Sequence, residues 1–176
     1  MRVFIYRLPT LALAVCVVAV CMSCGAINED LPTYETTSIV GVGDVAPDFT
    51  VMLLDGSSVT LSELIENEVL LVFFSHTCPD WKALFSDIAA ARGDFESKGV
   101  RVVAISRGGD ESEVREFVDS NGYWFDVAVD EHREIYNLYA TMYVPRAYMI
   151  DKQGVVVCAT VEYSEEYVSE LLAAID

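Results

Sequence analysis

The sequence predicts a single α/β domain in which helices flank a central mixed β-sheet. The continuous apolar run at residues 69–74 has the composition of a strand that is buried on both faces of a sheet, and residues 100–106 predict a second buried strand. Segments with helical spacing separate the strands, and this alternation is typical of βαβ units with parallel strands. The turn Asp151-Lys152-Gln153-Gly154 lies between two further apolar runs and predicts a hairpin, which adds antiparallel strands. The 176 residues suffice for one such domain and a leader.

The elements around the first buried strand are short, apart from one helix. Residues 49–54 predict a strand that ends in a turn at residues 55–58, and Ser62 is placed to cap a helix through Asn67. After the buried strand at residues 69–74, Pro79 favours a helix start, because proline is common in the first helical turn. This helix is expected to run to about residue 97. Its apolar face carries Trp81, Leu84, Phe85 and Ile88.

The second half continues the alternation. After the buried strand at residues 100–106, an amphipathic helix at residues 111–121 is stopped by Gly122. Residues 124–129 predict a third strand, and Asp130 is placed to cap a helix over residues 131–139. The hairpin pairs residues 146–150 with 155–161, and Ser164 is expected to cap a last helix to residue 175.

Charge and composition exclude several classes of partner. The formal net charge is -17, from 11 basic and 28 acidic residues, and such a surface repels nucleic-acid phosphates and anionic lipid headgroups. The loop Arg107-Gly108-Gly109-Asp110 lacks the spacing of a phosphate-binding glycine motif. His76 and His132 show no metal-ligand spacing with a cysteine or an acid. We therefore expect no nucleic acid, no metal and no cofactor.

The first 24 residues resemble a bacterial lipoprotein signal. Arg2 and Arg7 precede an apolar stretch at residues 11–21, and the small residue Ser23 stands before Cys24. The resemblance implies cleavage before Cys24, a lipid anchor on that cysteine, and a location in the bacterial cell envelope, facing the periplasm or the surface. Cys21 departs from the pattern, since an aliphatic residue is usual there, and an ordinary signal peptide or an uncleaved anchor stays open. Residues 1–23 would be the signal peptide, 24–45 an acidic tether and 46–176 the domain.

Five cysteines do not form a disulfide framework. Three of them precede residue 25, which leaves Cys78 and Cys158 in the domain. Cys78 follows a buried strand and opens a helix, where unpaired backbone N–H groups and the positive end of the helix dipole stabilise a thiolate. Cys158 is expected beside Ala147 in the hairpin, as a small buried residue that does not pair with Cys78.

Four motifs resemble the thioredoxin-like TlpA/ResA group, which overlaps in sequence with the AhpC/TSA redoxins. They are Val45-Ala46-Pro47-Asp48-Phe49, Val72-Phe73-Phe74-Ser75-His76-Thr77-Cys78-Pro79, Val144-Pro145, and Tyr148-Met149-Ile150-Asp151 with Gly154. The resemblance covers about residues 41–176 and implies a thioredoxin-like three-layer fold. It also implies an envelope thiol–disulfide oxidoreductase that acts on extracytoplasmic protein or small-molecule thiols and disulfides. By position, Cys78 is the attacking thiol, and Pro145 is a cis-proline that lies against it. Val144, Thr77 and Trp81 are the further candidates for substrate contact.

The motif departs from this group at its second cysteine, which is replaced by Trp81. A dithiol site resolves its own mixed disulfide because the second thiol is held beside the bond. Cys78 alone can attack a disulfide, but an external thiol must release the product. We also expect Trp81 to fill the space of the lost thiol, which competes with a role in substrate contact.

Neighbouring positions depart from the pattern too. Val72 stands where thioredoxins often hold a buried acid, and Thr77 replaces a usual tryptophan. The charge of Asp80 would disfavour a thiolate. Pro79 and His76 are candidate modulators of the thiol, although His76 could equally be a passive turn residue.

Two alternatives to thiol–disulfide exchange stay open, so that the sequence leaves catalysis undecided. A thioredoxin fold with one cysteine could be a non-catalytic module that binds peptides around Pro145. A peroxiredoxin-like peroxidase would use Ser75, three residues before the thiol, but Leu71 and Pro145 stand where that class has a proline and an arginine. Arg146 is one position off, and would either reach Asp80 or the thiolate, or be a solvated edge residue.

Overall fold

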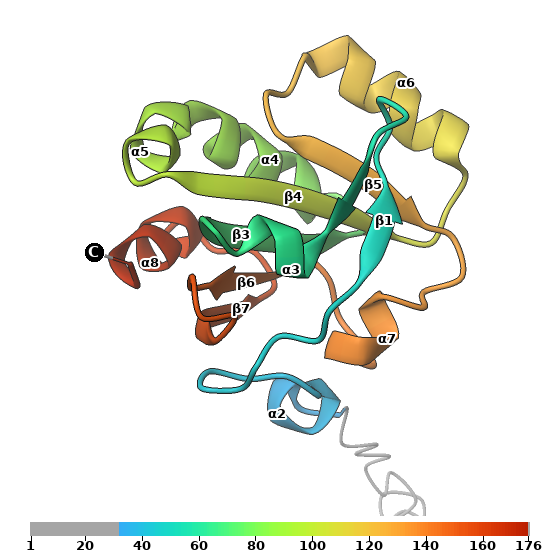
Figure 1. Cartoon of the computed structure of the whole chain (residues 1–176). Coiled ribbons are helices and arrows are strands. Elements are labelled where there is room, and N and C mark those ends of the chain that lie inside the picture. Colours follow the sequence, from blue (N-terminus) through green and yellow to red (C-terminus); the bar gives the residue numbers. More distant parts are fainter. Residues whose placement is uncertain (1–31, 176) are drawn as a thin grey trace, which may run out of the picture. The chain divides into compact units, whose positions relative to one another are not determined.

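The computed structural model describes residues 32–175, which fold around a five-stranded sheet (Figure 1). The strands lie in the order β5-β4-β3-β6-β7. Strand β3 pairs in parallel with β4 and antiparallel with β6, so the predicted mixed sheet is confirmed. The strands are β3 (Glu68–Phe74), β4 (Val100–Arg107), β5 (Asp126–Asp130), β6 (Arg146–Ile150) and β7 (Val156–Val161).

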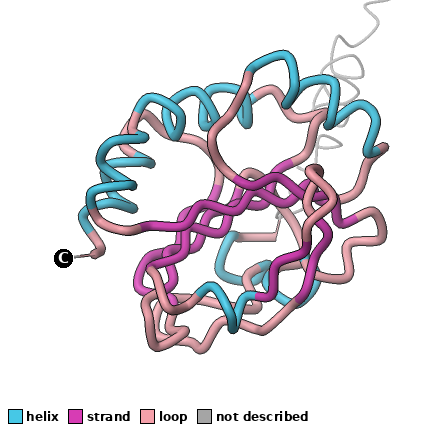
Figure 2. Tube along the Cα trace, turned by 45° about the horizontal axis from the view of Figure 1, so that its top comes forward, coloured by secondary structure: helices cyan, strands magenta, loops and turns pink. Residues whose placement is uncertain are grey.

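Each face of the sheet carries its own hydrophobic core, which makes the fold three-layered (Figure 2). Successive side chains of a strand point to opposite faces, and in β3 Leu70, Val72 and Phe74 face one core while Leu71 and Phe73 face the other. The first core is covered by the helices α4 (Asp80–Ala90), α5 (Arg92–Ser97), α6 (Glu111–Asn121) and α8 (Tyr167–Ala173). The second is covered by β1 (Thr50–Met52), β2 (Ser58–Thr60), α3 (Leu61–Leu64) and α7 (Tyr136–Tyr139). The expected thioredoxin-like arrangement is therefore present.

Several predicted elements differ in extent. The strand expected at residues 49–54 is the shorter β1, which forms a hairpin with β2, a strand that the sequence did not predict. The helix α3 begins one residue before Ser62 and has only four residues. Ser62 instead donates its backbone N–H to the Asp48 carboxylate at 2.9 Å, which ties the start of α3 to the segment before β1.

The long helix expected from Pro79 to residue 97 is broken in two. Helix α4 ends at Ala90, and Ala91 connects it to α5. The break redirects the chain so that Phe95 is completely buried in the α4-side core. Gly93, the second residue of α5, is a weak helix former and lowers the cost of interrupting the helix.

Asp130 is the last residue of β5 and caps no helix at residue 131. Its carboxylate accepts from the backbone N–H groups of Glu134 and Tyr136, both at 2.8 Å, and so organises the loop before α7. The last helix also begins later than predicted, at Tyr167, and Ser164 contributes only a backbone carbonyl to the preceding turn.

Part of the expected tether belongs to the folded domain. Residues 34–37 form the short helix α2, and Ile39 donates its backbone N–H to Tyr139 O at 2.9 Å. Val45 bridges Val155 beside the sheet. The domain boundary predicted at residue 46 is thus wrong, because these residues bury Thr37 and Val40 against the fold. The signal peptide and Cys24 lie outside the described residues. Between residues 32 and 175, no helix has the length and apolar character needed to cross a membrane.

Candidate active site

Cys78 lies between the end of β3 and the start of α4, as predicted. Its backbone N–H donates to Ser75 O at 3.0 Å, and Pro79 precedes the first helical residue, Asp80. Strand β3 is buried on both faces, so it holds the loop at the carboxyl end of the sheet. The thiol is half-buried and free of any disulfide, which leaves its sulfur open to a reactant.

The Cys78 sulfur has two hydrogen-bond acceptors close to it. Val144 O lies 3.8 Å away and Asp80 Oδ2 lies 3.9 Å away. The protonated thiol can donate to either oxygen. A thiolate can donate to neither oxygen, so neither contact stabilises the deprotonated sulfur.

The Val144–Pro145 peptide bond is cis, as the sequence predicted. This dipeptide leads into β6, which lies beside β3 in the sheet, and the contact between Val144 O and the sulfur brings the two loops together. Tyr143, just before the cis bond, has a positive φ of 68°. The predicted pairing of Cys78 with a cis-proline is therefore present in the fold.

Trp81 fills the α4 side of the site. Its side chain is 2% exposed, and its ring centroid lies 4.1 Å from that of Phe117 and 5.3 Å from that of Phe74. The expectation that Trp81 occupies the space of the lost thiol is consistent with this packing. Its assignment as a substrate contact is corrected, because a substrate cannot reach a side chain that is enclosed by aromatic rings.

The side chains of His76 and Thr77 contact different neighbours. The His76 imidazole Nε2 lies 2.9 Å from Glu113 on α6. A side-chain carbon at Gly109 would stand 2.5 Å from the His76 ring, so the glycine permits this contact between the loops. Thr77 is exposed, and its hydroxyl is 2.9 Å from the Ser75 hydroxyl. His76 therefore ties the cysteine loop to α6, whereas Thr77 and Ser75 stay at the site.

Arg146 does not reach the thiol, and it is not a solvated edge residue. Its side chain is 1% exposed and donates to Met142 O at 2.9 Å, Ser38 Oγ at 2.7 Å and Thr37 Oγ1 at 2.8 Å. Both alternatives considered for this residue are therefore wrong. Arg146 instead fastens the segment around α2 to the start of β6.

Cys158 pairs with Met149, rather than with Ala147. The prediction placed the turn symmetrically, but the Asp151 carboxylate accepts from the N–H groups of Gln153 and Val155, which widens the turn, and a bulge follows next to Ile150. Burial raises the pKa of the Cys158 thiol, and Glu170 raises it further. Both effects favour the protonated, unreactive form that a structural cysteine has.

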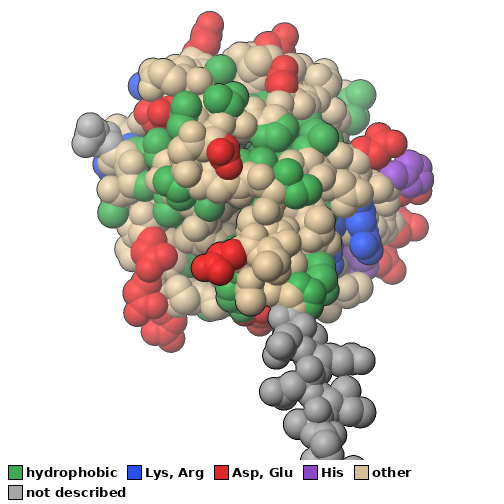
Figure 3. Space-filling model, turned by 90° about the horizontal axis from the view of Figure 1, so that it is seen from below, with side chains coloured by type: hydrophobic (Ala, Val, Ile, Leu, Met, Phe, Trp, Pro, Cys, Tyr) green, Lys and Arg blue, Asp and Glu red, His purple; other side chains and the backbone are tan. Residues whose placement is uncertain are grey.

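A cavity of about 470 Å³ opens beside Cys78. Its walls come from the segments at the carboxyl ends of the parallel strands β3, β4 and β5, which lie together, and from the loop before β6. It is lined by Ser75, Thr77, Cys78, Arg107, Arg133, Thr141, Met142, Tyr143 and Val144. Acidic side chains are scattered over the face shown in Figure 3, whereas the most prominent basic side chains gather at one margin beside histidine.

Arg107 and Arg133 line this cavity, although neither was predicted as a site residue. Arg107 is the last residue of β4, and its position next to the end of β3 was the available signal. Arg133 comes from the loop that Asp130 organises, and no local pattern indicates its position. Among the described residues, no group of His, Cys, Asp and Glu could hold a metal ion.

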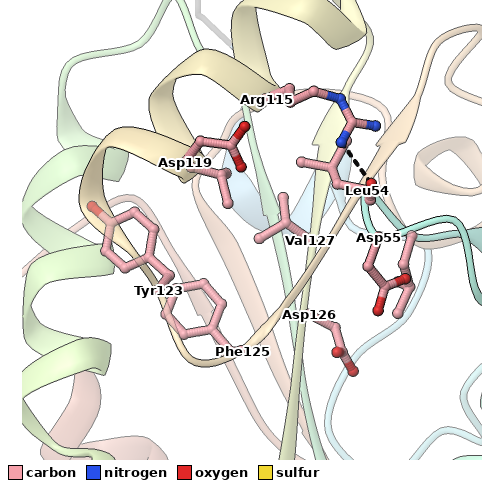
Figure 4. A pocket seen from close by; sticks show the side chains of 10 residues that line it. Leu54, Asp55, Arg115, Asp119, Tyr123, Phe125, Asp126 and Val127 are labelled. Atoms are coloured by element: carbon pink, nitrogen blue, oxygen red, sulfur yellow. Dashed lines mark hydrogen bonds between the residues drawn. The ribbon is translucent and has the colours of Figure 1, made fainter.

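A second cavity, of about 310 Å³, lies between α6 and the start of β5 (Figure 4). Arg115 points across it and donates to Leu54 O at 2.7 Å. It shares no lining residue with the cavity beside Cys78. Hydrogen-bond donors of Arg115 are therefore already taken up by Leu54 O and by the Glu111 carboxylate.

Comparison with known proteins gives a consistent set of relatives. The model of the AhpC/TSA family matches residues 42–159. The thiol-disulfide oxidoreductase ResA of Oceanobacillus iheyensis is 33% identical over 124 residues, which are 68% of this chain and 65% of that protein. ResA of Bacillus subtilis is 30% identical over 67% of this chain and 66% of its own length. The chain thus spans just under two thirds of these two relatives.

Solved structures agree with the fold. A protein of Chlorobium tepidum described as a thiol:disulfide interchange protein DsbE has a TM-score of 0.71 at 26% identity, and the match covers 78% of this chain and 99% of that one. A protein of Bacteroides thetaiotaomicron described as a protein disulfide isomerase has the same TM-score at 29% identity, over 78% and 89% of the two chains. Peroxidoxin BcpB of Mycobacterium tuberculosis, at 16% identity and a TM-score of 0.68 over 77% and 96%, shares the fold alone.

Proposed function

Because the chain belongs to the AhpC/TSA family, and its fold is that of thioredoxin-like thiol–disulfide oxidoreductases, we propose that it catalyses thiol–disulfide exchange through the single thiol of Cys78. The observation that carries this proposal is the position of the Cys78 sulfur. It lies just before α4 and 3.8 Å from Val144 O, the carbonyl oxygen next to the cis-proline Pro145. A helix start stabilises a thiolate, and the exposed rim around the sulfur gives a disulfide access to it.

The proposed reaction is two successive exchanges. The Cys78 thiolate attacks one sulfur of a substrate disulfide, a new S–S bond forms, and the other substrate sulfur leaves as a thiolate. An external thiolate then attacks the mixed disulfide and releases Cys78 as a thiolate. The net reaction replaces one half of the substrate disulfide by the external thiol: one thiolate enters, one thiolate leaves, and no further oxidant is needed.

The second exchange has to come from outside the protein. Trp81 occupies the position of a resolving thiol, and its indole is packed among Phe74, Phe85 and Phe117. Cys158 lies on β7, and β6 separates that strand from β3. Neither residue therefore supplies the local second thiol that makes dithiol sites fast.

Two measurements on the mature protein test this proposal. The rate at which iodoacetamide labels Cys78 is followed against pH, and the mixed disulfide with a peptide disulfide is identified by mass spectrometry. We expect an adduct on Cys78 that Cys158→Ser retains and Cys78→Ser loses. Labelling that follows an ordinary exposed thiol, with no adduct on Cys78, would count against catalysis.

The main alternative is a non-catalytic binding module, and the replacement of the second thiol by a buried Trp81 is the observation that favours it. In this case the groove around Pro145 would hold a peptide without any covalent step. Partners that co-purify equally with wild type and with Cys78→Ser, and never form an adduct, would support binding. The peroxidase alternative predicts peroxide consumption that depends on Cys78. It is weakened because Arg146 is committed to Thr37 and Ser38.

We also infer that the domain works in the cell envelope, held to a membrane by lipid on Cys24. The support is the arginine-bearing leader with Ser23-Cys24 at its end. Two or three acyl chains give stable anchoring where one chain is marginal. Cys24→Ser is expected to release the protein from the membrane fraction and to abolish labelling with a fatty-acid analogue, and retention of both would refute the anchor.

A further inference from the structure

The cavity beside Cys78 differs in charge from the rest of the chain. The protein has 28 acidic and 11 basic residues, but no acidic residue lines this cavity, whereas Arg107 and Arg133 do. Asp80 contacts the sulfur from the α4 side and takes no part in the lining. The walls of the cavity therefore present two guanidinium groups and no carboxylate.

Neither cavity arginine has an acidic partner among the described residues. By contrast, Arg92, Arg101 and Arg115 each have a carboxylate within 2.7 Å. An arginine without such a partner in so acidic a protein keeps its full capacity to bind an anion. The two cavity arginines therefore differ from Arg92, Arg101 and Arg115, whose charges are paired with carboxylates at the surface.

Arg107 is held in place without being neutralised. Its guanidinium carbon lies 5.0 Å from the centroid of the Tyr136 ring, and Nη1 donates to the Tyr136 hydroxyl at 3.4 Å. Its Nε is buried and has no hydrogen-bond partner. A buried donor without a partner is costly, so Arg107 has hydrogen-bonding capacity that the protein itself does not use.

Arg133 is brought next to Arg107 by the backbone. It has a positive φ of 61°, and its Nε lies 3.6 Å from the place that a side-chain carbon of Gly108 would occupy. The side chain therefore lies over the residue that follows Arg107, on the cavity side. The glycine leaves room for this close approach.

We propose that this cavity selects small-molecule disulfides that carry a carboxylate near the sulfur, with Arg107 and Arg133 as the carboxylate-binding residues. The inference rests on the proposed exchange at Cys78 and names its substrate class. The planar fork of arginine matches a carboxylate in shape and charge. A volume of about 470 Å³ is that of a pocket for a small ligand. With the carboxylate bound, the substrate sulfur is presented to Cys78, which forms the mixed disulfide while the second half leaves as a thiolate.

The test compares three disulfides that differ in charge: anionic dithiodipropionate, neutral hydroxyethyl disulfide and cationic cystamine. The second-order rate of mixed-disulfide formation on Cys78 is measured by mass spectrometry for each. Each rate is divided by the rate of the same disulfide with the urea-unfolded protein, which carries the same thiol without a cavity. We expect the anionic disulfide to be favoured over the cationic one by about tenfold or more, with the preference falling as salt is added.

Matched variants assign the preference to the cavity. Arg107→Gln and Arg133→Gln are expected to remove most of the preference for the anionic disulfide. Arg133→Lys should keep part of the preference, and Arg92→Gln, on a surface helix, should keep all of it. Arg133 is exposed, so its substitution leaves the fold intact even if Arg107→Gln does not fold.

The outcomes separate this inference from the proposed function. If Cys78 reacts with all three disulfides without a charge preference, the substrate class is wrong and the exchange activity stands. The same conclusion holds if the preference survives in Arg133→Gln and Arg107→Gln. If Cys78 reacts with none of them faster than the unfolded chain does, the exchange activity itself is refuted. If an acidic peptide disulfide outpaces dithiodipropionate by about tenfold, the carboxylate site holds but its natural ligand is a peptide.

Discussion

The loop that carries Cys78 has two unlike sides. On the α4 side, Trp81 packs in a cluster of aromatic rings and closes the position of the missing thiol. On the other side, Arg107 and Arg133 line an open cavity, and their charges are not paired with a carboxylate of the described chain. One side of the loop is therefore part of the hydrophobic core, and the other side is accessible. Residues on the first side should govern stability, and those on the second should govern reactivity.

Returning a thiol to the closed side is expected to have the largest effect on activity. Wild type should not reduce insulin with dithiothreitol beyond the uncatalysed rate, whereas Trp81→Cys should gain measurable turnover. The reason is the effective concentration of a thiol held beside the mixed disulfide, which reaches about 10⁵ M or more in well-oriented cases. Trp81→Ser is the control of equal size without a thiol. Equal activity in Trp81→Cys and Trp81→Ser would show that more than one thiol was lost.

Emptying the closed side should cost far more stability than changing the open side. Trp81→Ala is expected to lower the free energy of unfolding by about 3–5 kcal/mol, because a buried indole is lost and a cavity remains. Arg133→Ala, on the exposed wall, should change it by no more than about 0.5 kcal/mol. Urea unfolding followed by circular dichroism measures both. Similar losses in the two variants would contradict the division of the loop into a structural and a reactive side.

High pH should act through the buried tyrosines of the two cores. Burial raises the pKa of Tyr167, which shares the Trp81 core, and that of Tyr139 on the opposite face. Since the folded-state pKa values lie above the unfolded value of 10.0, the stability they contribute is complete below pH 10 and is lost as the pH rises further.

The expected loss is up to about 1.4 kcal/mol per pH unit for each tyrosine. Melting temperatures between pH 8 and 11 measure it, and these pH values are chosen to bracket the ordinary tyrosine pKa of about 10. Tyr167→Phe should flatten the dependence, and an unchanged slope in that variant would exclude its hydroxyl as a source.

The smallest effect is expected at the contact between the cysteine loop and α6. Glu113→Gln removes the charge opposite His76, and the exposed position of the glutamate limits the loss of stability to less than about 1 kcal/mol. The rate of iodoacetamide labelling at Cys78 should stay the same, because His76 faces Glu113 rather than the sulfur. A severalfold change in that rate would restore His76 as a modulator of the thiol.

The sheet, its two buried strands and the cis-proline could be predicted, because local patterns and a family resemblance carry that information. The helix break at Ala91 could not, since it depends on the burial of Phe95 in a core assembled from distant segments. The hairpin register was wrong by two residues because the Asp151 carboxylate enlarges the turn, which only three-dimensional contacts reveal.

The site was predicted only in part, for a similar reason. Cys78 and Val144-Pro145 lie in motifs, whereas Arg107 reaches the cavity from the end of β4 and Arg133 from the loop after β5. The role of Arg146 was missed because its partners, Thr37 and Ser38, are more than 100 residues away in the chain. Polar and acidic composition predicted a free tether over residues 25–45, but a few hydrogen bonds to the sheet order the part after residue 33.

The start of the folded domain sits at the rim of the cavity. Tyr143 lines the cavity and donates its hydroxyl to Pro32 O at 2.7 Å. Suppose that Cys24 carries lipid, as proposed. The eight peptide bonds between Cys24 and Pro32 can then span no more than about 28 Å. An anchor on Cys24 would therefore limit how far the rim of the cavity can move from the bilayer.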